Sequence, residues 1–254
     1  MVQPMIDWRH WHNEPWLVGG LVVLGWLWAI AAGPLRSKLA PGLPFPRAQA
    51  VRFYLGLFSF YIAVGSPLDQ VAERFLFSAH MLQHQILIFP AAILLLQGAP
   101  AWMIDPLLRP RLIQMPARLF THPLVAGVIY TLVVSVWHAP DLYDWALQDR
   151  LVHIIEHLMF FGAAVLYWWP VLSPSNVLRR RAFGVQMLYL LAIIIAITRA
   201  TQPGYSLGVW QQGHLASIFY RRGDIALLLH IGTCHATSLQ LRAVAHEALQ
   251  QVDV

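Results

Sequence analysis

The chain has 254 residues, of which 58% are hydrophobic and only 11% are charged, and its mean hydropathy is +0.55. Soluble domains carry about 25% charged residues, so this composition excludes that class and indicates an integral membrane protein. The formal net charge of +5 comes from arginines in short loops and indicates membrane topology, not nucleic-acid binding. We expect one all-α membrane domain over residues 1–254, because no Ser/Gly-rich linker or charged block divides the chain.

Apolar runs long enough for membrane helices follow one another along the chain. A transmembrane helix needs about 20 mostly apolar residues. We predict spans at about 16–32, 52–64, 78–97, 122–137, 151–172 and 183–198, bounded by Pro, Gly or polar residues. A later run, 225–241, is interrupted by His230, Gly232 and His235, so the sequence leaves six or seven spans. The amphipathic stretch 69–77 is expected at the membrane interface.

Basic residues alternate between loops, and this pattern predicts the orientation of the bundle. The stretch 1–15 lacks the basic segment and cleavage site of a secretory signal, so the first run is expected to stay in the mature protein. The loops after the first, third and fifth predicted spans carry Arg36, Lys38, Arg47, Arg52, Arg109, Arg111, Arg118, Arg179, Arg180 and Arg181. The alternate segments carry Asp69, Glu73, Asp141, Asp144 and Asp149. Since cytoplasmic loops are rich in Lys and Arg, we expect the N-terminus outside.

Histidine pairs begin two of the predicted spans. His80 and His84 begin the third span, and His153 and His157 begin the fifth. Residues i and i+4 lie one turn apart on the same face of a helix, so the imidazoles of each pair can bind one metal ion. The predicted topology puts both pairs just below the outer surface, where His138 at the exit of the fourth span reaches the same level. The sequence therefore predicts one outer layer of histidines.

Two further residues are candidate ligands in this layer. Glu156 is the clearest carboxylate inside a span, and it is either a direct metal ligand or an acceptor that orients an imidazole. Met81, beside His80, is a candidate thioether ligand. Buried ionisable residues in membranes mark ion pathways, proton relays or ligand sites. The plainer alternative is that these side chains only hydrogen-bond between helices.

The available ligand types narrow the choice of metal. Cys234 is the only cysteine, which excludes a thiolate cage and an intrachain disulfide. Imidazole suits copper, zinc, iron and nickel, and thioether sulfur favours copper(I), so the set permits copper without proving it. Metal capture and transfer require no substrate turnover, and we expect no enzymatic activity and no catalytic residues.

Several short motifs occur in order between Ser66 and Pro170. They are Ser78 to His84, Gly98 to Pro100, Trp137 to Pro140 with Leu142 to Asp144, and His153 to His157 with Trp168 to Pro170. Together they resemble the CtaG-type cytochrome c oxidase assembly factors.

This resemblance implies a multi-pass protein of the bacterial inner membrane that handles copper. The family's histidine motifs fall on His80, His84, His138, His153 and His157. The implied partners are subunit I of cytochrome c oxidase, which would receive copper for its buried centre, and a periplasmic copper donor. The family continues into a further clear span that begins with Asp-Gln. Here the stretch 221–224 leads instead into the interrupted segment, so the resemblance does not extend to the last span.

Two other functions use similar histidine pairs. A membrane cytochrome would use them as axial haem ligands, although two imidazoles on one helix face suit one small ion better than two porphyrins. A di-iron oxygenase or desaturase typically has more histidine boxes, including adjacent histidines, on the cytoplasmic side; this chain has no adjacent pair. A purely structural docking role for the layer is a third alternative.

Overall fold

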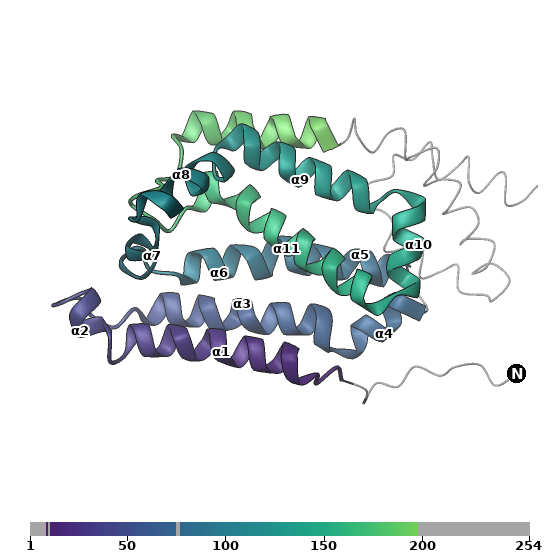
Figure 1. The fold of residues 1–254 in the computed structure, drawn as a ribbon, viewed down its shortest axis with the longest axis horizontal. Helices are drawn as coiled ribbons and strands as arrows, with labels where there is room; N and C mark the ends of the chain where they lie inside the picture. The colour runs from purple at the N-terminus through teal and green to yellow at the C-terminus, as the bar shows by residue number, and fades with distance from the viewer. Residues whose placement is uncertain (1–8, 10, 75–76, 198–254) are drawn as a thin grey trace, which may run out of the picture.

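The computed structural model describes residues 9, 11–74 and 77–197, and the regular structure within them is entirely helical. This confirms the all-α prediction. Figure 1 shows a bundle of roughly aligned helices, among them α1 (Pro15–Ala32), α3 (Arg47–Gly65), α9 (Pro123–Trp137) and α11 (Arg150–Leu172). The helix Phe183–Ile197 lies beside α9, where the side chains of Tyr189 and Ile193 approach Gly127.

Within the described residues, four segments are long and apolar enough to cross a membrane. They are Pro15–Ala32, Arg47–Ala72, Ser78–Gly98 and Arg150–Leu172, which correspond to the first, second, third and fifth predicted spans. A fifth candidate is the pair Arg111–Phe120 and Pro123–Trp137, bent by 66°. The apolar helix Phe183–Ile197 is shorter, and the stretch 225–241 lies outside the described residues. The structure thus supports four or five spans, so the predicted number of six or seven remains a prediction.

The third predicted span is helical but interrupted. It consists of α5 (Phe77–Ile86), the π-helical turn η1 (Leu87–Ala91) and α6 (Ala92–Gly98). Pro90 has no backbone N–H to donate and lies inside the π turn. Trp168 of α11 donates from Nε1 to the carbonyl oxygen of Ile88 at 2.9 Å, which pairs one carbonyl of the turn within an apolar region. This contact also connects the third span to α11.

Helices α3 and α6 approach closely through glycines. A Cβ placed on Gly98 would lie 2.5 Å from the backbone nitrogen of Phe53, and one on Gly56 would lie 2.9 Å from the nitrogen of Leu95. Small residues permit such close backbone packing in membrane bundles. The Trp28 indole of α1 donates to the Gly98 carbonyl oxygen at 3.0 Å and joins α1 to the same contact.

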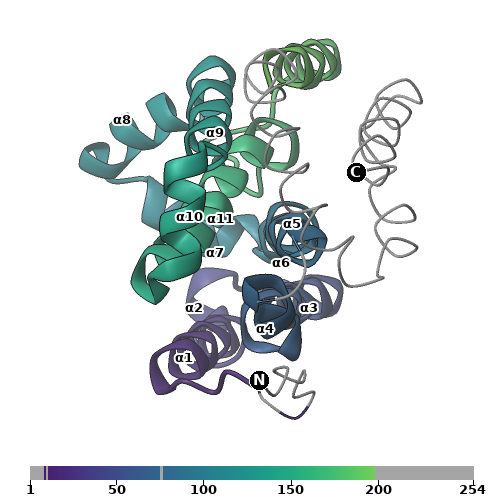
Figure 2. The same cartoon turned by 90° about the vertical axis from the view of Figure 1, so that its right-hand side faces the viewer.

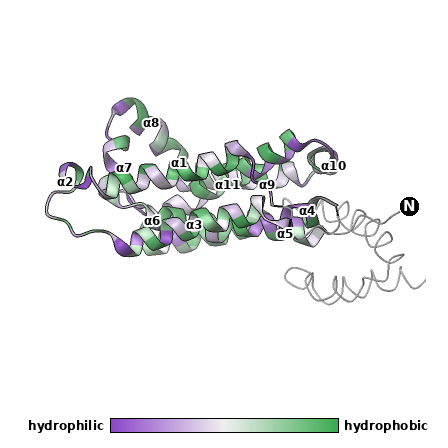
Figure 3. Cartoon of the chain, turned by 90° about the horizontal axis from the view of Figure 1, so that it is seen from below, coloured by the Kyte–Doolittle hydropathy of each residue, from purple (hydrophilic) through white to green (hydrophobic). Residues whose placement is uncertain are grey.

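The connecting elements gather at the two ends of the bundle. Helices α2 (Arg36–Leu39), α7 (Ala101–Leu108) and α8 (Arg111–Phe120) lie at one end, and α4 (Pro67–Arg74) and α10 (Pro140–Gln148) lie at the other (Figure 1). Figure 3 shows hydrophobic residues along α1, α3 and α9, with more hydrophilic residues toward the ends. The connections at the end with α2, α7 and α8 are basic, and α4 and α10 at the other end carry acidic residues. This distribution agrees with the alternation of basic and acidic segments along the sequence.

At the basic end, a buried carboxylate joins α7 by hydrogen bonds to the segment that follows α11. Asp105 of α7 accepts hydrogen bonds from the Ser175 hydroxyl at 2.5 Å, the Asn176 backbone nitrogen at 3.0 Å and the Asn176 side-chain amide at 3.2 Å. Burial opposes ionisation of Asp105, but these hydrogen bonds outweigh it and lower the pKa of the carboxyl below its ordinary value of 3.8.

Candidate metal centre

The histidine layer lies at the end of the bundle that carries α4 and α10. Figure 2 looks onto this end, where α4, α5, α10 and α11 come together. The start of α11 is fixed by Asp149, whose carboxylate accepts from the backbone nitrogens of Leu151 at 2.8 Å and Val152 at 3.2 Å. Because this cap fixes the first turn, His153 and His157 follow within the first two turns of α11.

The structure brings the two predicted histidine pairs together. Ring centroids are 4.4 Å apart for His80 and His84 and 4.3 Å apart for His153 and His157. Across the helix interface, His80 lies 5.4 Å from His153, and His84 lies 5.3 Å from His157. All four side chains are buried. The predicted convergence of α5 and α11 in one layer is therefore confirmed as geometry, while metal binding remains a prediction.

Glu156 lies between the imidazoles of the first pair. It is only 1% exposed, and its Oε1 is 3.7 Å from His80 Nε2 and 3.6 Å from His84 Nε2. These separations are too long for good hydrogen bonds. Two ligand atoms that each lie about 2.1 Å from one ion are about 3.4 to 3.6 Å from each other, so the spacing of Oε1 from each nitrogen suits a shared metal ion. One ligand atom from each of the three residues lies within 4.8 Å of the others.

Several nitrogens in the layer have no hydrogen-bond partner among the described residues. They are both ring nitrogens of His80, both ring nitrogens of His84, and Nε2 of His157. Leaving a buried polar atom unpaired costs about 1 to 3 kcal/mol, so a layer built only for structural hydrogen bonds would be expected to pair them. For these atoms, the described part of the chain does not provide the hydrogen bonds that the purely structural alternative requires.

The remaining candidates lie at the margin of the layer. The His138 ring is 6.4 Å from the His84 ring, and its Nδ1 is 2.6 Å from the Val134 carbonyl oxygen. If Nδ1 donates that hydrogen bond, Nε2 carries the lone pair that a metal needs. Met81 is half-buried beside His80 on α5, and neither its role nor that of His138 as a ligand is tested by this geometry.

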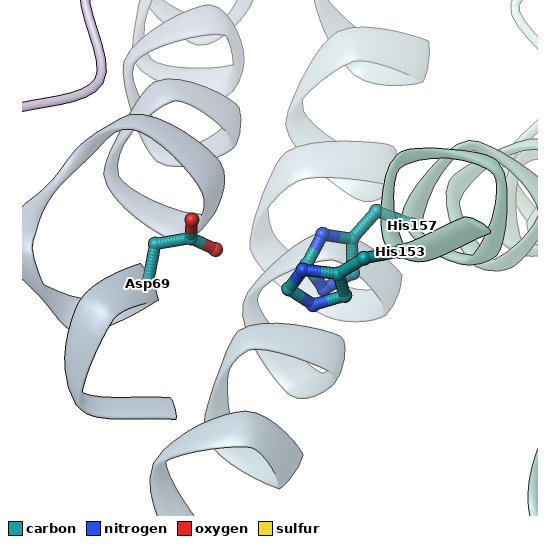
Figure 4. Close-up of side chains that lie close together, drawn as sticks. All are labelled: Asp69, His153 and His157. Carbon is teal, nitrogen blue, oxygen red and sulfur yellow. The ribbon is translucent and has the colours of Figure 1, made fainter. Parts of the chain in front are cut away.

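Two residues near the layer were not predicted as site residues. Asp69 of α4 is buried and faces His153 and His157 (Figure 4), and one ligand atom from each of these three residues lies within 4.8 Å of the others. Tyr143 of α10 is also buried, with its ring 5.4 Å from that of His80. The sequence placed Asp69 at the membrane interface because its surroundings are amphipathic. Nothing in that pattern indicated that α4 packs against α5.

Comparison with known families decides the relationship of the chain. The family described as cytochrome c oxidase caa3 assembly factor (Caa3_CtaG) matches residues 26–202. The chain belongs to this family. The match contains α3 to α11 and every histidine of the layer, and it confirms the resemblance drawn from the motifs. No curated protein and no solved structure matches the chain. Membership in Caa3_CtaG identifies an assembly factor for cytochrome c oxidase, and the apolar helices are those of a membrane protein.

Proposed function

We propose that this Caa3_CtaG protein binds copper in its histidine layer and delivers it to the copper centre in subunit I of cytochrome c oxidase. The observation that carries the proposal is the buried arrangement of His80, His84 and Glu156, in which the carboxylate oxygen lies 3.7 and 3.6 Å from the two imidazole nitrogens. Imidazole and carboxylate ligands are compatible with copper. No enzymatic step is needed.

The surroundings of His80, His84 and Glu156 suit the transfer of an ion as well as its binding. The imidazoles of His153 and His157 lie across the helix interface, at 5.4 Å from His80 and 5.3 Å from His84. An ion held by three protein ligands keeps coordination positions open, and a neighbouring or incoming ligand can take one before another is released. A site near one end of the bundle gives such an exchange a short route to a partner.

The proposal includes a location and an orientation. In the inner membrane of a bacterium, the end with α4 and α10 would face the periplasm and receive copper from a periplasmic donor, because the opposite end carries the basic connections. The N-terminus would then lie outside. The copper centre of subunit I would be filled from the same side.

The proposal is tested on the oxidase itself. In cells lacking their own copy of this protein, we would express either the wild type or the double variant His80→Ala, His84→Ala, purify cytochrome c oxidase, and measure copper and haem per complex. We expect oxidase from the variant to retain haem and to lack copper in subunit I. His122→Ala is the matched control, because His122 is exposed. It directly precedes the first residue of α9, whereas His138 of the histidine layer follows the last residue of that helix. A full copper content with the double variant would overturn the proposal.

A further inference from the structure

A second group of potential ligands lies beside the first without sharing a residue with it. His80, His84 and Glu156 form one group, and Asp69, His153 and His157 form the other, with all three ligand atoms in each group within 4.8 Å of one another. Figure 4 shows the Asp69 carboxylate facing the two imidazoles. Each group therefore offers two imidazoles and one carboxylate as ligands, enough for an ion of its own.

The Asp69 carboxylate is held in place from the helix that carries the first group. Gln83 of α5 is fully buried, and its Nε2 donates to Asp69 Oδ1 at 2.7 Å and to the Ala63 carbonyl oxygen at 2.7 Å. Each carboxylate oxygen has two lone pairs, so the hydrogen bond from Gln83 leaves Oδ1 able to bind a cation. Gln83 is thus a positioning residue that orients Asp69 toward α11.

The imidazole side of this group provides a separate observation. His157 is 5% exposed, and its Nε2 has no hydrogen-bond partner in the part of the chain that the structure describes. A buried nitrogen with no competing bond is a ready metal ligand. The 4.8 Å limit on the ligand separations exceeds the roughly 3.5 Å expected around one ion, and small side-chain rotations can close that gap.

The N-terminal segment reaches Asp69 from outside the bundle. His12 Nδ1 lies 2.9 Å from Asp69 Oδ2, and the backbone nitrogen of His12 donates to the Gly65 carbonyl oxygen at 2.8 Å. The segment is held further by an ion pair between Glu14 and Arg150 at the start of α11. His12 is more exposed than Asp69, with side-chain exposures of 16% and 8%, so it is the outer member of the contact.

We propose that Asp69, His153 and His157 form a second metal position, and that copper enters the layer through it, by way of His12, before it reaches His80, His84 and Glu156. This inference rests on the proposed copper-handling function and extends it from one position to two. The two positions are adjacent, so two cations repel each other and the second ion binds more weakly than the first. An ion at either position is therefore released more readily while the other position is occupied, which suits a site that passes its ion on.

The test is a copper titration of the full chain in detergent micelles, with copper(I) under reducing conditions and copper(II) in a separate series. Bound copper per chain is measured after gel filtration. We expect two ions per wild-type chain, bound in two separable steps. Asp69→Asn should retain one ion, and Glu156→Gln should also retain one. The control Asp144→Asn, an exposed carboxylate in α10, should bind two.

The outcomes separate this inference from the function on which it rests. A wild type that binds a single ion in one step, or an Asp69→Asn variant that still binds two, would overturn the second position and leave the proposed function intact. A wild type that binds no copper would overturn the proposed function. The two-step titration needs only the wild type, so the inference stays testable even if Asp69→Asn does not fold. His12→Ala should keep two ions per chain and slow their uptake several-fold; unchanged uptake would exclude entry by way of His12.

Discussion

Replacing Glu156 by leucine distinguishes a metal position from a structural ion-pair network. The carboxylate is 1% exposed, its Oε2 has no hydrogen-bond partner among the residues described, and its Oε1 is more than 3.5 Å from the nearest imidazole nitrogens. Leaving such a group unpaired costs about 1 to 3 kcal/mol. Leucine has a similar volume and needs no hydrogen bond. In the metal-free protein we therefore expect Glu156→Leu to raise the free energy of unfolding by about 1 to 3 kcal/mol.

The same variant should lose copper binding at this position. A ligand at 100 times its dissociation constant stabilises the folded state by about 2.7 kcal/mol, and the variant should lose the part of this gain that comes from the His80, His84 and Glu156 position. Unfolding would be followed by tryptophan fluorescence during titration with sodium dodecyl sulfate, with and without copper. The control Asp144→Leu removes an exposed carboxylate in α10 and should change the stability by no more than about 0.5 kcal/mol.

A loss of about 3 to 5 kcal/mol in metal-free Glu156→Leu would refute this reasoning. That is the cost of breaking a buried ion pair by removing one partner. It would mean that a protonated imidazole and the carboxylate stabilise the fold together, and the layer would then be a structural network.

Three further predictions concern the rest of the bundle. Gly98→Ala should destabilise the protein by about 1 to 3 kcal/mol in the same titration, because its Cβ would lie 2.5 Å from a backbone nitrogen of α3. The matched variant Gly162→Ala meets no described atom within 4 Å and should not destabilise; equal losses would contradict the close packing of α3 and α6. The pKa of Asp105 is lowered in the folded state, so its contribution to stability is present above the unfolded pKa and disappears as the pH falls through the folded value. Asp105→Asn should flatten the decline in stability as the pH falls below the ordinary carboxyl pKa of 3.8, and an unchanged decline would exclude this carboxyl as its source. In a cysteine-free background, Arg180→Cys should resist an impermeant thiol reagent added to whole cells and Asp144→Cys should react with it; the reverse result would invert the proposed topology.

The histidine layer was predictable because helix geometry and chain direction leave little freedom. The i and i+4 spacing fixes each pair on one helix face, and alternating loops bring the starts of α5 and α11 to the same end. The same alternation predicts that α9 ends where α5 and α11 begin. His138, directly after α9, therefore lies at the margin of the layer. Those steps depend only on local sequence and on the order of the spans.

The contact between Asp69 and His12 could not be found in this way, because it depends on tertiary packing. Asp69 reaches α11 only because α4 packs against α5, where Gln83 holds its carboxylate. His12 meets Asp69 because the N-terminal segment hydrogen-bonds to the end of α3 at Gly65. Neither contact has a periodic pattern in the sequence.

Helix boundaries near charged or irregular residues were also hard to predict. The second span was expected to begin at Arg52, whereas α3 begins at Arg47. Both arginines are exposed, and their long side chains can extend toward the interface while the helix continues. A boundary drawn from hydropathy therefore places the start of this helix too late. Pro90 was visible inside the third span, but the π-helical turn around it depends on packing that includes the Trp168 hydrogen bond.

Metal analysis combined with an optical spectrum tests the central claim most directly. The full chain would be purified from copper-replete cells, as the wild type and as the double variant His80→Ala, His84→Ala, with His122→Ala as control. The account predicts stoichiometric copper without a Soret band in the wild type and the control, and a marked loss of copper in the double variant. A Soret band would instead indicate a membrane cytochrome, and stoichiometric iron without haem would indicate a di-iron protein. A copper content that is unchanged in the double variant would contradict a site built on His80 and His84.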